Sequence, residues 1–201
     1  MKAVLLAILG AAALPGCALL WKSDPVVSRY FTLEDDGDPA AVRAPAGLRL
    51  RLGRVEGWSH LRERMVARDA ARELSYAEDR RWTERPEIFL RRALARTLFE
   101  ERGLVEALSG RAVTLDVELI AFEEIEQPHR VRMQVGLVLR DDRTGLLQET
   151  ITVERPVAHG EGADRAPAVV EAFSQALRAG VARIADRVVE RLEAQPSTPS
   201  P

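Results

Sequence analysis

The side chains of this 201-residue chain that could serve as acid, base or nucleophile lie far apart in the sequence. Its three histidines, His60, His129 and His159, stand in separate polar stretches without metal-ligand spacing, so exposed loop positions explain them better. Ser174 lacks the flanking glycines of a nucleophilic serine and fits a small residue on a helix face. We therefore expect no catalytic site, no metal and no cofactor.

Three neighbouring glutamates, Glu123, Glu124 and Glu126, resemble the paired carboxylates of acid–base catalysis. They follow a predicted strand and come directly before Gln127 and Pro128, where a hairpin end is expected. The better interpretation is a solvated hairpin end, with these carboxylates exposed to water.

A group of arginines near an aromatic residue offers a different chemistry. It consists of His60, Arg62, Arg64, Arg68, Arg81 and Trp82. Guanidinium groups beside an aromatic ring could bind an acidic partner surface or lipid phosphates through paired hydrogen bonds. A solvated sheet face with ordinary charges explains the same arginines, and Trp82, like Trp58, could lie at the edge of the core. Both interpretations stay open from the sequence alone.

The N-terminus has the pattern of a secretion signal. Lys2 is followed by an apolar run from Ala3 to Leu14. At ~1.5 Å per residue in a helix, this run is too short for a hydrocarbon core of ~30 Å, but it fits the apolar middle of a signal peptide. We predict that residues 1–16 are a signal peptide that is removed.

Cys17 is the single cysteine of the chain, so an internal disulfide is impossible. Leu14, Pro15, Gly16 and Cys17 resemble the lipobox of bacterial lipoproteins. The resemblance implies cleavage between Gly16 and Cys17, a diacylglycerol thioether at Cys17 and a fatty acyl chain, such as palmitate, on its new amine. In Gram-negative lipoproteins, Asp directly after the lipidated cysteine keeps the protein in the inner membrane. Ala18 stands at that position here, so the resemblance implies the periplasmic face of the outer membrane. An ordinary signal with a chance cysteine is the alternative.

Composition indicates one domain on a short tether. The formal net charge is −2 at pH 7, and lysine stands only at positions 2 and 22, so nucleic-acid binding is not suggested. We predict a lipidated N-terminus and tether at 17–28, a folded domain at 29–193 and a disordered tail rich in Pro and Ser at 194–201.

Alternation of apolar and polar residues predicts the sheet. Strands with one wet face are expected at 113–119, 131–139 and 150–154, with a hairpin turn at 141–145. Weaker patterns predict a short strand at 29–33, another at 48–52, and strands around a turn within 60–76.

Two amphipathic helices complete the domain. Pro86 suits a helix N-terminus, and Gly103 supplies the stop after apolar residues at four-residue steps. Apolar residues at spacings of three and four predict the longest helix at 167–193. The predicted fold class is α+β, a mainly antiparallel sheet with both amphipathic helices packed on one face.

Several short segments together resemble a known family. They are residues 29–33 (RYFTL), 73–76 (ELSY), 81–84 (RWTE), and Val170 with residues 172–177 (AFSQAL). Their order and spacing resemble the ABC-type transport auxiliary lipoproteins, which serve lipid transporters built around MCE proteins. The resemblance covers about residues 29–192.

This resemblance implies a non-enzymatic role in a lipid pathway across the envelope. It implies an outer-membrane lipoprotein that meets a periplasmic MCE protein, whose permease and ATPase lie in the inner membrane. Two alternatives stay open: an assembly or plug lipoprotein of another outer-membrane machine, and a lipid-cleaving enzyme. The sequence leaves open the lipid, the direction of transport and whether the domain assembles with copies of itself.

Overall fold

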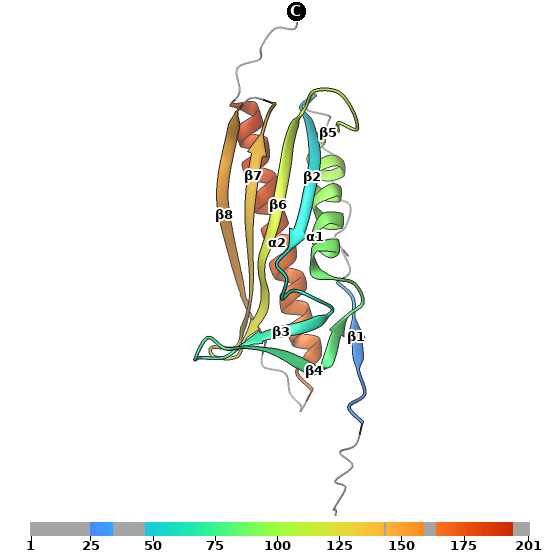
Figure 1. Ribbon diagram of the computed structural model, residues 1–201, viewed down its shortest axis with the longest axis vertical. Helices are drawn as coiled ribbons and strands as arrows, with labels where there is room; N and C mark the ends of the chain where they lie inside the picture. Colours follow the sequence, from blue (N-terminus) through green and yellow to red (C-terminus); the bar gives the residue numbers. More distant parts are fainter. Residues whose placement is uncertain (1–24, 34–46, 143, 159–163, 195–201) are drawn as a thin grey trace, which may run out of the picture.

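The computed structural model describes residues 25–33, 47–142, 144–158 and 164–194, which form one sheet backed by two helices (Figure 1). Gly16, Cys17 and His159 lie outside the described residues, as do the predicted signal and most of the predicted tail. No helix in the described part is both long and apolar enough to cross a membrane.

The elements follow one another in the predicted order, with one short strand, β5, that was not predicted. The strands are β1 (Arg29–Phe31), β2 (Arg49–Gly57), β3 (Arg64–Arg68), β4 (Leu74–Trp82), β5 (Val105–Glu106), β6 (Val113–Ile125), β7 (Arg130–Arg140) and β8 (Gly145–Pro156). The helices are α1 (Pro86–Ala95), its π-helical continuation η1 (Arg96–Glu101) and α2 (Ala166–Glu193). The α+β class is confirmed.

The longest strand, β6, organises the sheet. Along one side it pairs antiparallel with β7, which pairs antiparallel with β8, as the alternation predicted. Its other side is shared, because β2 runs parallel to the first half of β6 and β3 runs parallel to its end. The sheet is therefore mixed. The parallel β2–β6 pair needs a crossover connection, and α1 lies within that connection.

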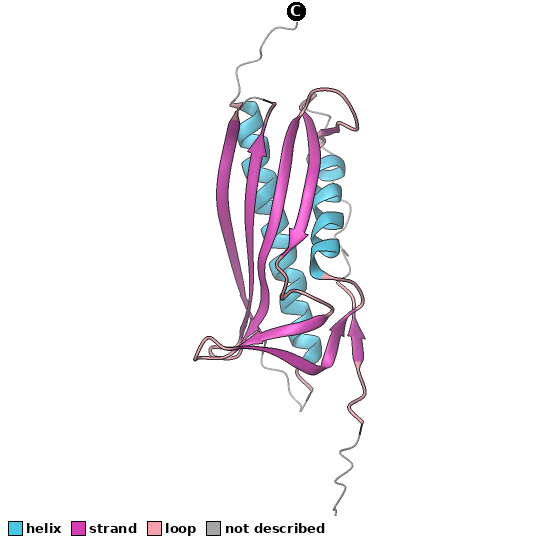
Figure 2. Ribbon diagram, in the orientation of Figure 1, coloured by secondary structure: helices cyan, strands magenta, loops and turns pink. Residues whose placement is uncertain are grey.

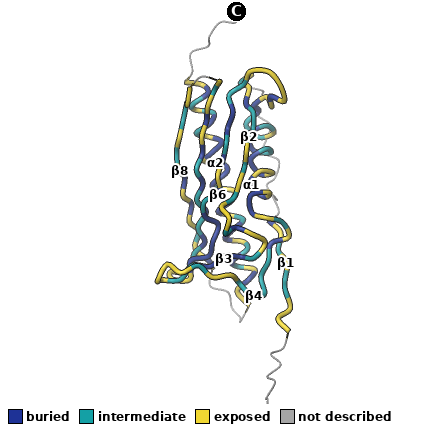
Figure 3. The backbone as a smooth tube through the Cα atoms, in the orientation of Figure 1, coloured by how far each residue is buried: buried dark blue, intermediate teal, exposed yellow. Residues whose placement is uncertain are grey.

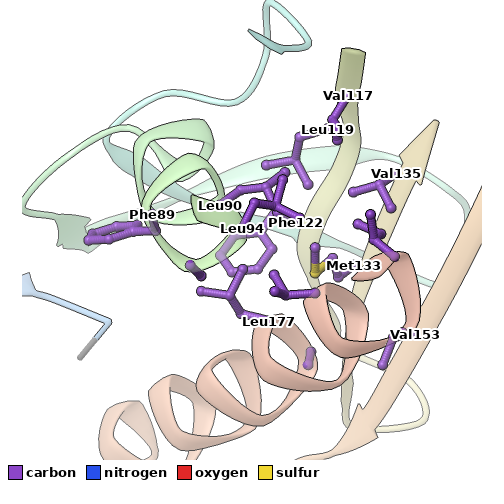
Figure 4. Packing of buried hydrophobic residues seen from close by; sticks show 14 of the residues in the cluster. Phe89, Leu90, Leu94, Val117, Leu119, Phe122, Met133, Val135, Val153 and Leu177 are labelled. Carbon is purple, nitrogen blue, oxygen red and sulfur yellow. The ribbon is translucent and has the colours of Figure 1, made fainter. Parts of the chain in front are cut away.

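Both helices lie on the same face of the sheet (Figure 2). α1 contacts β2, while α2 runs along β7 and β8. The core between the layers contains Leu90 and Leu94 from α1, Phe122 from β6, Met133 from β7 and Leu177 from α2 (Figure 4). Burial of these apolar side chains is the main force that holds the layers together.

A glycine allows α2 to approach the sheet closely. A Cβ atom at Gly180 would lie 2.9 Å from the Sδ atom of Met133, which is closer than packed atoms tolerate. The predicted stop at Gly103 is also confirmed, since this residue follows η1 with φ +68°, a conformation that glycine adopts readily.

The domain has two distinct ends. At the lower end in Figure 1, β1 lies beside the end of β4, the β3–β4 hairpin crosses below the long strands, and the described chain begins. The upper end carries the loop between β5 and β6, the β7–β8 turn and the end of α2. The helices and strands are buried where they face each other, whereas the loops at both ends are exposed (Figure 3).

Candidate functional site

Three of the predicted contact residues come together at the surface. His60 and Arg62 lie in the loop after β2, and Arg64 begins β3. With the exposed rings of Trp58 and Tyr76 they form what we call the loop patch. The patch thus joins the end of β2 to the β3–β4 hairpin, on the lower half of the domain.

Ring and guanidinium contacts hold the loop patch together. The Arg64 guanidinium lies 5.5 Å from the centre of the Tyr76 ring, and the Trp58 and His60 rings meet edge-on at 6.2 Å. The Tyr76 hydroxyl donates a 3.3 Å hydrogen bond to the His60 carbonyl. These contacts order the patch while leaving much of both large rings exposed.

The loop patch has unused hydrogen-bonding capacity. Arg62 donates from Nε to the Ser59 carbonyl at 3.1 Å, and Arg64 donates to the Ala77 carbonyl at 3.4 Å. Neither guanidinium pairs with a carboxylate among the described residues, and the buried Nε2 atom of His60 has no partner there. Exposed aromatic rings beside arginines are suited to an acidic or phosphate-bearing partner.

Arg68 is bound within the domain and not to the loop patch. Its Nε and Nη2 atoms donate to both carboxylate oxygens of Glu123, at 2.9 and 3.0 Å. This hydrogen bonding raises the pKa of the Arg68 guanidinium. The structure thus gives Arg68 an internal partner, and its role as a contact residue stays a prediction.

Trp82 lies inside the hydrophobic core. It is 1% exposed and meets the Phe173 ring edge-on at 5.1 Å, with Phe89 and Phe122 close by. The alternative that placed Trp82 at the edge of the core is the closer one, although the side chain lies inside the core. Trp82 is the last residue of β4, and its ring packs against Phe89 of α1 and Phe173 of α2.

Arg81 lies directly across the β3–β4 pairing from Arg64 of the loop patch, but its side chain contacts the segment that leads into β1. Its Nε atom donates a 3.1 Å hydrogen bond to the Ser28 hydroxyl, and in the sheet it is paired with Tyr30 of β1. The Arg81 side chain is half-buried. Arg81 therefore secures the entry of the chain into the sheet at the lower end.

The expectation of exposed carboxylates at 123 and 124 is wrong. Glu123 is fully buried and Glu124 nearly so, whereas Glu126 is exposed as expected. The cause is an irregularity between Leu119 and Ala121, which shifts the alternation and lets β6 continue to Ile125. Because a bulge breaks the alternation of apolar and polar residues, that alternation does not reveal that the strand continues beyond it.

Each buried glutamate is held by two arginines. Glu123 accepts hydrogen bonds from Arg68 and Arg132, which lie on the flanking strands β3 and β7. Glu124 accepts them from Arg80 of β4, at 3.0 Å, and from Arg165 just before α2, at 3.3 Å. Successive strand residues point to opposite faces, so the two glutamates bind arginines on the two sides of the sheet.

The candidates for catalysis stay separate in the structure. His129 is exposed at the end of the β6–β7 hairpin, and Ser174 lies half-buried on α2. Within the described ranges, no three side chains of His, Cys, Asp or Glu are grouped as metal ligands.

The sequence did not reveal a hollow on the outer face of the sheet, opposite the helices. It has a volume of about 320 Å³ and lies over Gly136, which has no side chain to fill it. Beside it, Glu56 of β2 and Glu118 of β6 are direct neighbours in the parallel register. The alternation in each strand could have placed both glutamates on a polar face. That they are neighbours depends on the register in which β2 pairs with β6, which the sequence does not give.

The fold and these surfaces define an α+β domain whose described residues present groups suited to binding. The chain belongs to the family of ABC-type transport auxiliary lipoprotein components, because the family model matches residues 31–185. This match confirms the resemblance found in the sequence. No curated protein sequence matches the chain.

Solved structures share the fold. A Xanthomonas campestris protein assigned to the DUF330 family is 17% identical, with a TM-score of 0.64 over 82% of this chain and 97% of its own. A structure described as an uncharacterized protein is 18% identical, with a TM-score of 0.61 over 81% and 99%. A hypothetical protein from Chlamydia trachomatis is 10% identical, with a TM-score of 0.51 over 74% and 99%. At these identities the likeness shows the fold alone.

Proposed function

We propose that this chain is a lipid-anchored, non-enzymatic auxiliary component of an MCE-type ABC lipid transport system. It acts at the periplasmic face of the outer membrane of a Gram-negative bacterium. The observation that carries this proposal is the family match over residues 31–185, together with a lipobox-like segment that ends at Cys17, a short distance before the domain.

The proposed anchor follows from the chemistry of Cys17. Each buried methylene contributes about 0.8 kcal/mol to membrane binding, so two or more acyl chains hold a protein firmly whereas one does not. Ala18 in place of Asp supports the outer membrane as the destination. The transporter partner must then come from the periplasm to meet the anchored domain.

We assign the contact with the periplasmic MCE protein to the loop patch. Trp, Tyr and Arg are the residue types that contribute most to protein interfaces, and Trp58, Arg62 and Tyr76 present them on an ordered surface. The loop after β2 and the β3–β4 hairpin, which carry the patch, lie in the lower half of Figure 1, and the described chain begins at the lower end. A partner bound there is close to the membrane, as lipid transfer requires.

A photocrosslinking amino acid at position 76 of the lipidated chain tests the assignment in the native envelope. We expect it to capture a periplasmic MCE protein, and Arg62→Glu to reduce the yield severalfold. The matched control places the same crosslinker at Leu108, which is exposed in the loop at the opposite end.

Other results would contradict the proposal. Capture of an outer-membrane β-barrel in place of an MCE protein would favour the assembly or plug role. Lipid turnover by the purified protein that is lost on changing His60 or Ser174 would favour an enzyme. Equal MCE capture from positions 76 and 108 would contradict the loop patch as the contact.

A further inference from the structure

Large apolar side chains are exposed where the chain enters the domain. Val26 is 55% exposed, Val27 78% and Tyr30 65%. They lie within five consecutive residues, at or just before β1, at the lower end of the molecule in Figure 1. Exposed apolar groups concentrated at one place on a surface mark a contact with a partner or a membrane.

These residues are attached to the domain and are not part of a free tether. β1 pairs with β4, with Tyr30 beside Arg81 and Phe31 beside Trp82. Arg29 forms a 2.9 Å ion pair with Asp164, just before α2, and this hydrogen bond lowers the pKa of the Asp164 carboxyl. Tyr30 therefore keeps a fixed position relative to the sheet. Val26 and Val27 lie directly before Ser28, whose hydroxyl accepts a hydrogen bond from Arg81.

The length of chain before this segment limits its distance from the membrane. Cys17 is eight residues before Pro25, the first described residue. Even fully extended, those residues reach at most ~29 Å, at up to ~3.6 Å each. An acylated Cys17 thus limits how far Pro25, and the exposed residues that follow it, can lie from the membrane surface.

We propose that Val26, Val27 and Tyr30 rest in the interface of the membrane that holds Cys17, so that the domain stands on the bilayer in a fixed orientation. This inference rests on the lipid anchor of the proposed function. Tyrosine suits the interface, since its ring contacts apolar chains while its hydroxyl stays hydrated.

The orientation has a consequence for the rest of the molecule. The long strands β6, β7 and β8 run between the two ends of the domain (Figure 1). With the lower end on the membrane, the loop between β5 and β6 points into the periplasm, and the loop patch faces sideways near the bilayer. A protein partner could then reach the loop patch without displacing the membrane contact.

Vesicle binding by the mature full chain carrying Cys17→Ser tests this inference, because acyl chains are then absent. The probe is sedimentation with vesicles of phosphatidylethanolamine and phosphatidylglycerol. We expect the chain to bind reversibly, and Val26→Ser/Val27→Ser/Tyr30→Ser to weaken the binding at least tenfold. The matched control is Leu108→Ser, which removes a side chain that is 86% exposed at the opposite end and should leave binding unchanged.

Several results would overturn the inference. One is no binding by the parent chain, and another is equal binding by the triple variant and the parent. Unchanged vesicle binding combined with loss of crosslinking to the transporter would assign the segment to a protein interface. The test is independent of acylation, so its failure would leave the proposed anchor at Cys17 intact, and a chain found unacylated in cells would not alter its result.

Discussion

The Arg68 guanidinium donates two hydrogen bonds, of 2.9 and 3.0 Å, to the carboxylate of Glu123, a side chain with no exposed surface. The two residues are 55 positions apart and join β3 to β6. Arg132 of β7 donates to the same carboxylate. The β3–β4 hairpin, which carries part of the loop patch, is thereby fixed to the central strand.

Removing Arg68 should destabilise the domain, because Glu123 would keep a buried charge with one partner fewer. We expect Arg68→Met to lower the free energy of unfolding by about 2 kcal/mol, below the ~3–5 kcal/mol of a fully unpaired buried charge because Arg132 stays. Urea unfolding followed by circular dichroism measures the change. Arg62→Met, at an exposed position of the same region, should stay within ~0.5 kcal/mol of the parent. Equal stability of the two variants would contradict a structural role for Arg68.

Arginines from the two helices donate hydrogen bonds to backbone carbonyls of β8 and β2, the strands toward the two lateral edges of the sheet. Arg183 and Arg191 of α2 donate to the carbonyls of Thr152 and Leu146 on β8, at 3.2 and 2.8 Å. Arg91 of α1 donates to the Gly53 carbonyl of β2 at 2.8 Å. Unpaired strand edges attract other strands, so these side chains oppose edge-to-edge association.

We therefore predict that Arg183→Ala/Arg191→Ala promotes self-association through β8, which pairs with β7 alone among the described strands. Light scattering after size-exclusion chromatography should show a shift to dimers or larger species with the fold retained. Arg178→Ala is the matched control, because Arg178 lies on the same helix but pairs with Glu171. If the double variant shows the same molar masses in light scattering as Arg178→Ala, the two arginines do not protect the edge of β8 from association.

The contact between α2 and the sheet depends on Phe173. This side chain has no exposed surface, and its ring centre is 4.5 Å from that of Phe122. We predict that Phe173→Asp unfolds the domain, since it would bury a charge without a partner, and that Phe173→Ala costs roughly 3–5 kcal/mol. Thermal unfolding followed by circular dichroism measures both, with Gln175→Ala as the exposed control on the same helix. An unchanged melting temperature in Phe173→Asp would refute the packing.

The anchor can be tested separately from the fold. We predict that Cys17→Ser gives a folded protein that is absent from washed membranes, because the exposed apolar segment alone binds reversibly. Fractionation of the envelope and intact-mass analysis of the parent chain measure this. Retention of the variant in washed outer membranes, or a parent N-terminus without acyl chains, would argue against anchoring by lipid.

Most elements could be predicted because their causes lie close together in the chain. The alternation in β7 and the spacing of three and four in α2 each depend on neighbours within a few residues. The resemblance to the family also came from short segments in order, and the family match confirms it. The end of β6 was missed because a bulge shifts the alternation before Glu123.

The sequence by itself determined most of the elements, the family and the candidate lipidation residue Cys17, since each follows from local pattern. Only the tertiary structure decided which of several similar residues are exposed at the surface and which are buried or bound inside the domain. Arg64 stays at the surface while Arg68 binds Glu123, and Trp58 is exposed while Trp82 is buried. The physical reason is that partners such as Glu123 and Phe173 are distant in the chain, and strand register and helix packing set their proximity.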